Sequence, residues 1–108
     1  MLFRSLIILI STAVYAYSLS CFDCGSGQRN TPCQTYDASI QQNQCSKKEN
    51  KCFEVGVEFL YDEESTVLYQ RGCSAGIDLC KDYKLVYGKD RIMTCKVCTE
   101  SGCNNHTL

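Results

Sequence analysis

Features that would indicate a membrane-spanning chain or a nucleic-acid-binding protein are missing from this 108-residue sequence. The longest apolar stretch, residues 5–14, is about half the roughly 20 residues that a membrane-spanning helix needs. Basic residues form no stripe or cluster beside stacking aromatic residues, so we expect no nucleic-acid partner. Beyond the first 20 residues there is no internal repeat, no linker and no helical stripe longer than one turn.

Groups for catalysis and metal binding are also scarce. His106 is the only histidine, and no serine or cysteine nucleophile can be matched with a base and an orienting group around it. Asp62, Glu63 and Glu64 lack the spacing and supporting ligands of an EF-hand, which favours a solvated loop over a calcium site. We therefore expect a protein that is not an enzyme, with no cofactor and no metal.

The amino end has the layout of a secretory signal peptide. A short, positively charged start at residues 1–4 precedes the apolar stretch, and small residues follow it. Cleavage after Ala16, Ser18 or Ser20 fits the small-residue rule, and we favour Ser18. The sequence therefore predicts a signal peptide over 1–18 and a single domain over 19–108. Loss of Arg4 leaves ten basic and twelve acidic residues, a net charge of −2.

Ten cysteines lie between Cys21 and Cys103, an even number in a chain predicted to be secreted and extracellular. Small domains of this kind bury little apolar surface and commonly add disulfides, each worth about 2–4 kcal/mol. Spacing alone cannot choose among about 945 pairings. Two Cys-x-x-Cys units, 21–24 and 95–98, are also typical of zinc ribbons. Export and the six remaining cysteines favour disulfides over zinc, and no βαβ pattern supports a redox motif.

Period-two alternation predicts β-hairpins. Apolar residues alternate with mostly polar ones over 53–61, a break follows at 62–65, and strand formers return at 66–69. A second hairpin is predicted with strands at 83–87 and 91–94 around a turn at 88–90. Residues 25–32 are turn formers, and 34–44 show no clear period. The predicted fold class is small, disulfide-rich and all-β.

The order of the cysteines resembles the three-finger family, which includes lymphocyte antigen six, the urokinase receptor domains and snake three-finger toxins. The resemblance covers the whole mature chain. Its most specific parts are the opening Leu19-Ser20-Cys21-Phe22-Asp23-Cys24 and the ending Cys98-Thr99-Glu100-Ser101-Gly102-Cys103-Asn104, with Arg71-Gly72-Cys73 between them. Vertebrate members often have adjacent eighth and ninth cysteines, whereas Cys95 and Cys98 are separated by two residues, as in invertebrate members.

The resemblance implies a three-finger fold in which two to three β-hairpins project from a five-disulfide hub. The pairs it implies are Cys21–Cys52, Cys24–Cys33, Cys45–Cys73, Cys80–Cys95 and Cys98–Cys103. It also implies that Asn104 forms hydrogen bonds within the hub.

The function implied by the resemblance is a secreted binding module whose loop tips modulate a membrane receptor or ion channel, with nicotinic receptors among the candidates. The residues we expect at the contact are Tyr61, Asp62, Glu63, Glu64, Tyr87, Lys89 and Arg91. The alternative for the tyrosines is that they cover a thin core. Snake toxins that block nicotinic receptors carry a cation at the second fingertip, so the acidic residues here disfavour a cation-pocket blocker.

Two other functions fit the same features: a venom or salivary effector that acts on another animal, and a structural protein of extracellular matrix or junctions. Asn105-His106-Thr107 is a possible glycosylation sequon. A lipid-anchor signal needs an apolar tail of about 10–20 residues, and only residues 104–108 follow Cys103. If the chain is complete, we expect it to be released, with no direct membrane anchor.

Overall fold

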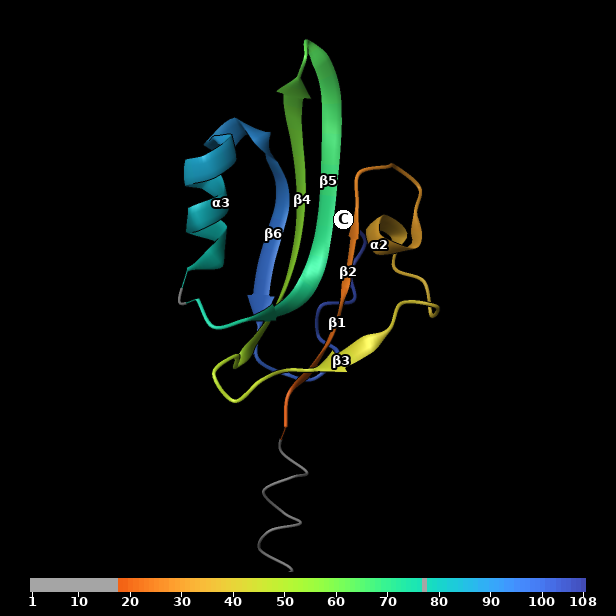
Figure 1. Ribbon diagram of the computed structural model, residues 1–108, viewed down its shortest axis with the longest axis vertical. Coiled ribbons are helices and arrows are strands. Elements are labelled where there is room, and N and C mark those ends of the chain that lie inside the picture. Colours follow the sequence, from red (N-terminus) through yellow and green to blue (C-terminus); the bar gives the residue numbers. More distant parts are fainter. Residues whose placement is uncertain (1–17, 77) are drawn as a thin grey trace, which may run out of the picture.

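The computed structural model describes residues 18–76 and 78–108, so the expected signal peptide over 1–18 lies outside the described residues except for Ser18. Two antiparallel sheets form the body (Figure 1). The small sheet pairs β1 (Ser20–Phe22) with β3 (Gln42–Gln44), and the large sheet has the order β2-β5-β4-β6. Its strands are β2 (Cys24–Ser26), β5 (Glu64–Ser74), β4 (Lys51–Tyr61) and β6 (Ile92–Cys98). With five disulfides, this confirms the small disulfide-rich, all-β class.

The β4–β5 hairpin is the longest element of the fold. Its two 11-residue strands pair without a shift from Lys51 opposite Ser74 to Tyr61 opposite Glu64. The predicted hairpin is thus confirmed, but its turn is only Asp62–Glu63 and its return strand is longer than predicted. Residues directly opposite each other share one face of a sheet, so this register fixes which side chains each face presents.

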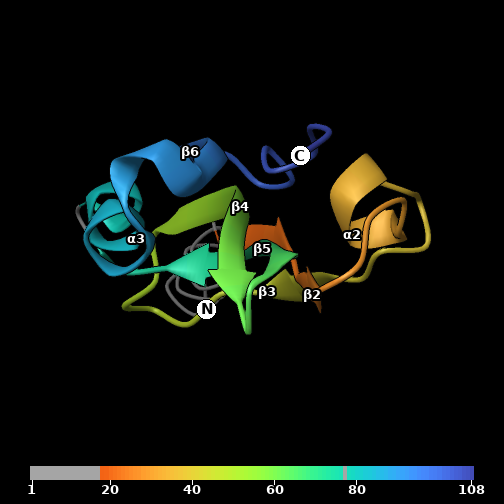
Figure 2. The same ribbon diagram turned by 90° about the horizontal axis from the view of Figure 1, so that it is seen from above.

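Each face of the large sheet is covered by a different element (Figure 2). Helix α3 (Leu79–Tyr87) covers one face, where Tyr87 lies 5.4 Å from Phe59 between ring centroids. The short helix α2 (Pro32–Thr35) and the C-terminal residues cover the other. There, Tyr69 is fully buried against Cys33, Val67 and the partly buried Leu108. Gly56 leaves room for the Tyr69 ring, which is 3.4 Å from the place a Cβ would occupy.

The prediction of a strand at 83–87 is wrong, because these residues belong to α3. Asp78 caps the helix by accepting a hydrogen bond from the Lys81 N–H, and Gly88, with φ of 96°, donates its N–H to the Lys84 carbonyl and ends it. Helical spacing of Cys80, Tyr83 and Tyr87 turns these side chains toward the sheet. The glycine predicted to form a hairpin turn therefore closes a helix, followed by the 3-10 turn η1 (Lys89–Arg91).

Glu54 lies on the face of β4 that the alternation predicts to be mostly polar, yet it is only 1% exposed. Its carboxylate accepts a 2.7 Å hydrogen bond from Arg71 Nη1, and Arg71 is also 1% exposed. Arg71 further donates to backbone carbonyls, those of Cys33, Gln34, Asn104 and His106. Burial lowers the pKa of the Arg71 guanidinium, and the charge and hydrogen bond of Glu54 oppose that change.

The disulfide pairs in the structure are those implied by the resemblance: Cys21–Cys52, Cys24–Cys33, Cys45–Cys73, Cys80–Cys95 and Cys98–Cys103. Asn104 is completely buried beside them. Its amide donates to the carbonyls of Phe22 and Phe53, and its Oδ1 accepts from the Phe22 N–H. The side chain thus joins β1 of the small sheet to β4 of the large sheet.

Replacing Arg71 with alanine should lower the free energy of unfolding by about 3–5 kcal/mol, because it leaves the Glu54 carboxylate buried without its charged partner. Urea unfolding with the disulfides intact measures this change. The matched control is Arg29→Ala, which removes a surface pair with Glu58 at 3.5 Å and should cost about 1 kcal/mol or less. Equal losses in both variants would contradict the proposed role of burial.

Candidate functional site

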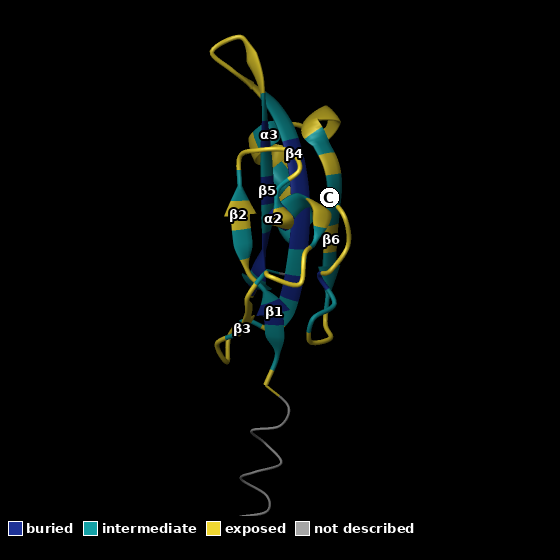
Figure 3. Cartoon of the chain, turned by 90° about the vertical axis from the view of Figure 1, so that its right-hand side faces the viewer, coloured by how far each residue is buried: buried dark blue, intermediate teal, exposed yellow. Residues whose placement is uncertain are grey.

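The tip of the β4–β5 hairpin is the most exposed apolar part of the strands. Leu60 is 60% exposed and Tyr61 is 70% exposed, and the acidic residues Asp62, Glu63 and Glu64 beside them are exposed too (Figure 3). Asp62 and Glu63 form the two-residue turn with φ of 53° and 66°. This backbone is that of a type I′ turn, in which Asn-Gly is preferred. Aspartate tolerates this conformation, so Asp62 fits the turn, whereas the longer side chain of Glu63 makes the same conformation unfavourable.

Contacts at the base of the tip hold the hairpin in shape. Ser65 donates a 2.7 Å hydrogen bond from its hydroxyl to Glu58 Oε1 across the strand pair, and Arg29 lies 3.5 Å from the same carboxylate. The pKa of Glu58 is lowered mainly by the hydrogen bond from Ser65 and, to a smaller extent, by the positive charge of Arg29. Val57 is the last residue of β4 that pairs with β6. From there to the turn, β4 pairs only with β5, so the tip is a two-stranded ribbon.

The second expected set, Tyr87, Lys89 and Arg91, does not lie on a hairpin tip. Tyr87 is the last residue of α3 and is half-buried between Phe59 and Tyr83, which favours the alternative that the tyrosines cover the core. Lys89 and Arg91 are exposed in η1, which contacts β4. The structure thus brings Tyr61–Glu64 together and leaves the second set farther down the hairpin, beside α3.

Helix α3 also exposes apolar residues that the strand interpretation missed. Leu85 and Val86 are 76% and 74% exposed because Cys80, Tyr83 and Tyr87 occupy the face turned toward the sheet. Tyr83 donates its hydroxyl hydrogen to Gln70 Oε1, and burial raises the pKa of Tyr83 above its usual value. The capping residues Asp78 and Gly88 were the sequence signal for this helix.

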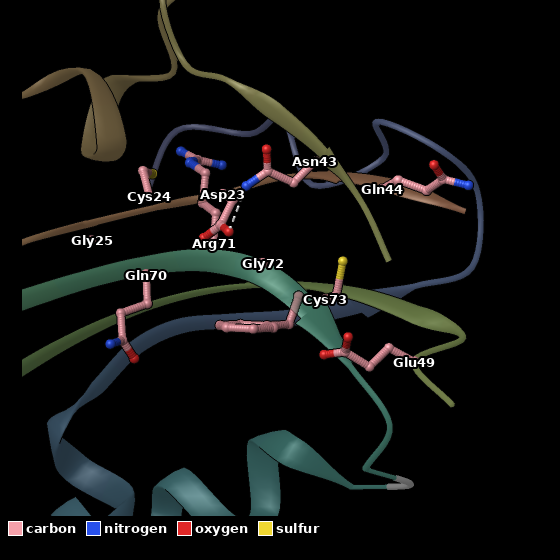
Figure 4. A pocket seen from close by; sticks show the side chains of 11 residues that line it. Asp23, Cys24, Gly25, Asn43, Gln44, Glu49, Gln70, Arg71, Gly72 and Cys73 are labelled. Carbon is pink, nitrogen blue, oxygen red and sulfur yellow. Dashed lines mark hydrogen bonds between the residues drawn. The ribbon is translucent and has the colours of Figure 1, made fainter. Parts of the chain in front are cut away.

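A polar groove of about 780 Å³ lies between the two sheets (Figure 4). Asp23 and Asn43 line one side, where Asn43 Nδ2 donates a 2.9 Å hydrogen bond to Asp23 Oδ2. Phe53 lies against Gly72, with a ring carbon 3.2 Å from the position of a Cβ at that glycine. Cys73 and Glu49 also line the groove. It was missed from the sequence because its residues come from separate segments.

The reactive groups of the described residues are engaged in structural contacts. His106 Nδ1 contacts Glu54 Oε1, the other oxygen of the carboxylate that binds Arg71. The sulfur atoms of Cys21, Cys45 and Cys73 lie within 4.8 Å of one another, but each belongs to a disulfide and is therefore not a thiolate ligand. Asn105 of the possible sequon is exposed. Within 18–76 and 78–108, no helix is long and apolar enough to cross a membrane.

The comparisons with known proteins add no relative: no protein-family model, no curated protein and no solved structure matches the chain.

Replacing Glu63 with glycine should raise the free energy of unfolding by roughly 0.5–1 kcal/mol, because glycine adopts positive φ without the penalty of a side chain. Chemical denaturation of the oxidised protein measures the change. The control is Glu64→Gly, one residue later in β5, where glycine should destabilise the strand by about as much. A loss of stability in the Glu63 variant would contradict the strained turn.

Proposed function

We propose that this chain is a secreted, non-enzymatic binding module of the three-finger family, and that its hairpin tip modulates a membrane receptor or ion channel, with nicotinic receptors as the first candidates. Five disulfides in a domain of this size are typical of extracellular proteins. The agreement between these pairs and the pairing implied by the cysteine order supports the family, as does the buried position of Asn104.

The observation that carries the proposal is the exposure of Leu60 and Tyr61 at the end of a braced hairpin. Neither side chain contributes much to the core, so their apolar surface is free for a partner. Tyrosine is among the residues that dominate interface energies. Because the full-length pairing of β4 and β5 already orders the strands, binding loses little conformational entropy.

The acidic residues of the tip suggest how the partner is approached. Asp62, Glu63 and Glu64 place three negative charges within one turn. Such a cluster favours association with a positively charged surface and makes the association rate depend on salt. It also disfavours insertion into a pocket that selects cations, so we propose modulation at an outer surface of the receptor.

The test is voltage-clamp recording from oocytes that express nicotinic receptors, with acetylcholine applied in the presence and absence of the purified protein. The wild-type chain should change the amplitude or concentration dependence of the current. Leu60→Ser with Tyr61→Ser should reduce its potency at least tenfold, because a lost hot spot costs about 2 kcal/mol or more.

The matched control for the tip variant is Lys47→Gln with Lys48→Gln, which changes two exposed residues in the loop between β3 and β4. It should keep the wild-type potency. Full potency of the tip variant would exclude the tip as the contact, and a wild-type chain without effect would exclude nicotinic receptors as its target.

A further inference from the structure

Two disulfides touch each other at the hub. Cys21 Sγ and Cys45 Sγ belong to different disulfides, Cys21–Cys52 and Cys45–Cys73, and lie only 3.2 Å apart. A disulfide bond joins sulfur atoms at about 2.05 Å, so a bond between Cys21 and Cys45 requires them to approach by about 1 Å. Cys45 directly follows the exposed strand β3, where such a displacement meets little packing.

The remaining two cysteines of these disulfides also face each other. Cys52 in β4 is directly opposite Cys73 in β5 in the register of the large sheet. Opposite residues in an antiparallel pair have Cα atoms about 4.5–5.5 Å apart, which lies within the range that a disulfide spans. The register therefore permits a Cys52–Cys73 disulfide with β4 and β5 in place. Cys45 lies two residues beyond Asn43, the partner of Cys21, so the Cys21–Cys45 disulfide also needs a small shift of the backbone at Cys45.

An external thiol reaches one of the two disulfides before the other. Cys21 and Cys52 are both 0% exposed, whereas Cys45 and Cys73 are partly exposed and Cys73 lines the groove in Figure 4. A thiolate therefore has access to the Cys45–Cys73 disulfide and none to Cys21–Cys52.

We propose that the hub is a thiol-triggered disulfide switch, which changes from Cys21–Cys52 and Cys45–Cys73 to Cys21–Cys45 and Cys52–Cys73. A low-molecular-weight thiolate attacks Cys73 Sγ and releases the Cys45 thiolate. The Cys45 thiolate attacks the neighbouring Cys21 Sγ and releases the Cys52 thiolate. The Cys52 thiolate then attacks Cys73 Sγ and expels the original thiolate, so the exchange consumes no reductant.

The exchange changes what the disulfides connect. In the present pairing, Cys21 of β1 is joined to β4, and Cys45 after β3 is joined to β5, so both disulfides link the small sheet to the large sheet. In the second pairing each disulfide lies within one sheet. The groove has walls from both sheets, Asn43 on one side and Phe53 on the other, so in the second pairing neither of these disulfides connects its two walls.

The first experiment incubates the oxidised protein with reduced glutathione at pH 8, blocks thiols by alkylation and digests with trypsin without reduction. Cleavage after Arg29, Lys51 and Arg71 separates the segments that carry the four cysteines. The present pairing keeps these segments in one cross-linked assembly, because Cys24–Cys33 connects the first two. The second pairing splits them into two assemblies of unequal mass, which mass spectrometry resolves.

A variant makes the central step visible without added thiol. Cys73→Ser leaves the Cys45 thiol beside Cys21, and we expect it to form Cys21–Cys45 and to leave Cys52 as the free thiol, which alkylation in denaturant identifies. The control is Cys80→Ser, which frees Cys95 outside the cluster of hub sulfurs and should keep Cys21–Cys52. If the wild-type digest stays in one assembly and the Cys73 variant retains Cys21–Cys52, the switch is excluded. Receptor binding plays no part in these measurements, so their failure leaves the proposed function standing.

Discussion

The structure depends on the buried guanidinium of Arg71. Its planar head donates to the Glu54 carboxylate and to the carbonyls of Cys33, Gln34, Asn104 and His106, so one side chain of β5 connects β4, α2 and the C-terminal residues. An arginine suits this position because its five donors point outward in one plane, whereas a lysine presents a single ammonium group. These segments contain few apolar residues of their own, and polar contacts replace the hydrophobic core that they lack.

Polar contacts of Arg71 stabilise one face of the large sheet, and aromatic contacts of α3 stabilise the other. How far each covering element extends along the hairpin determines where the hairpin becomes exposed. Arg71 and Tyr69 pack α2 and the C-terminal residues against the C-terminal half of β5. On the other face, Tyr83 and Tyr87 pack α3 against the sheet, and these aromatic contacts extend along β4 no farther than Phe59. Neither covering element reaches Leu60 or Tyr61. The exposed tip is thus a consequence of strands that are longer than the elements packed on them.

Sequence patterns predicted the part of the fold that local alternation encodes. The β4–β5 hairpin followed from alternation over 53–61, and the disulfide pairs followed from the family resemblance. Helix α3 was missed because the apolar residues at 83, 85 and 87 fit a strand, while its helical character lay in the caps Asp78 and Gly88. The Glu54–Arg71 pair was missed because Glu54 occupies a polar position in the alternation, and only the register reveals that Arg71 faces it. The groove and the hub contacts depend on tertiary structure alone.

Asn104 links the two sheets at the hub without using a disulfide. Its amide holds Phe22 of β1 and Phe53 of β4 by hydrogen bonds that involve no cysteine side chain. Because Asn104 is completely buried, these hydrogen bonds do not compete with water, and losing one would leave an unsatisfied buried group. The sheets consequently have a second attachment that is independent of the disulfides between them. The proposed exchange therefore does not require the separation of β1 from β4, because the hydrogen bonds of Asn104 do not pass through the exchanging sulfur atoms.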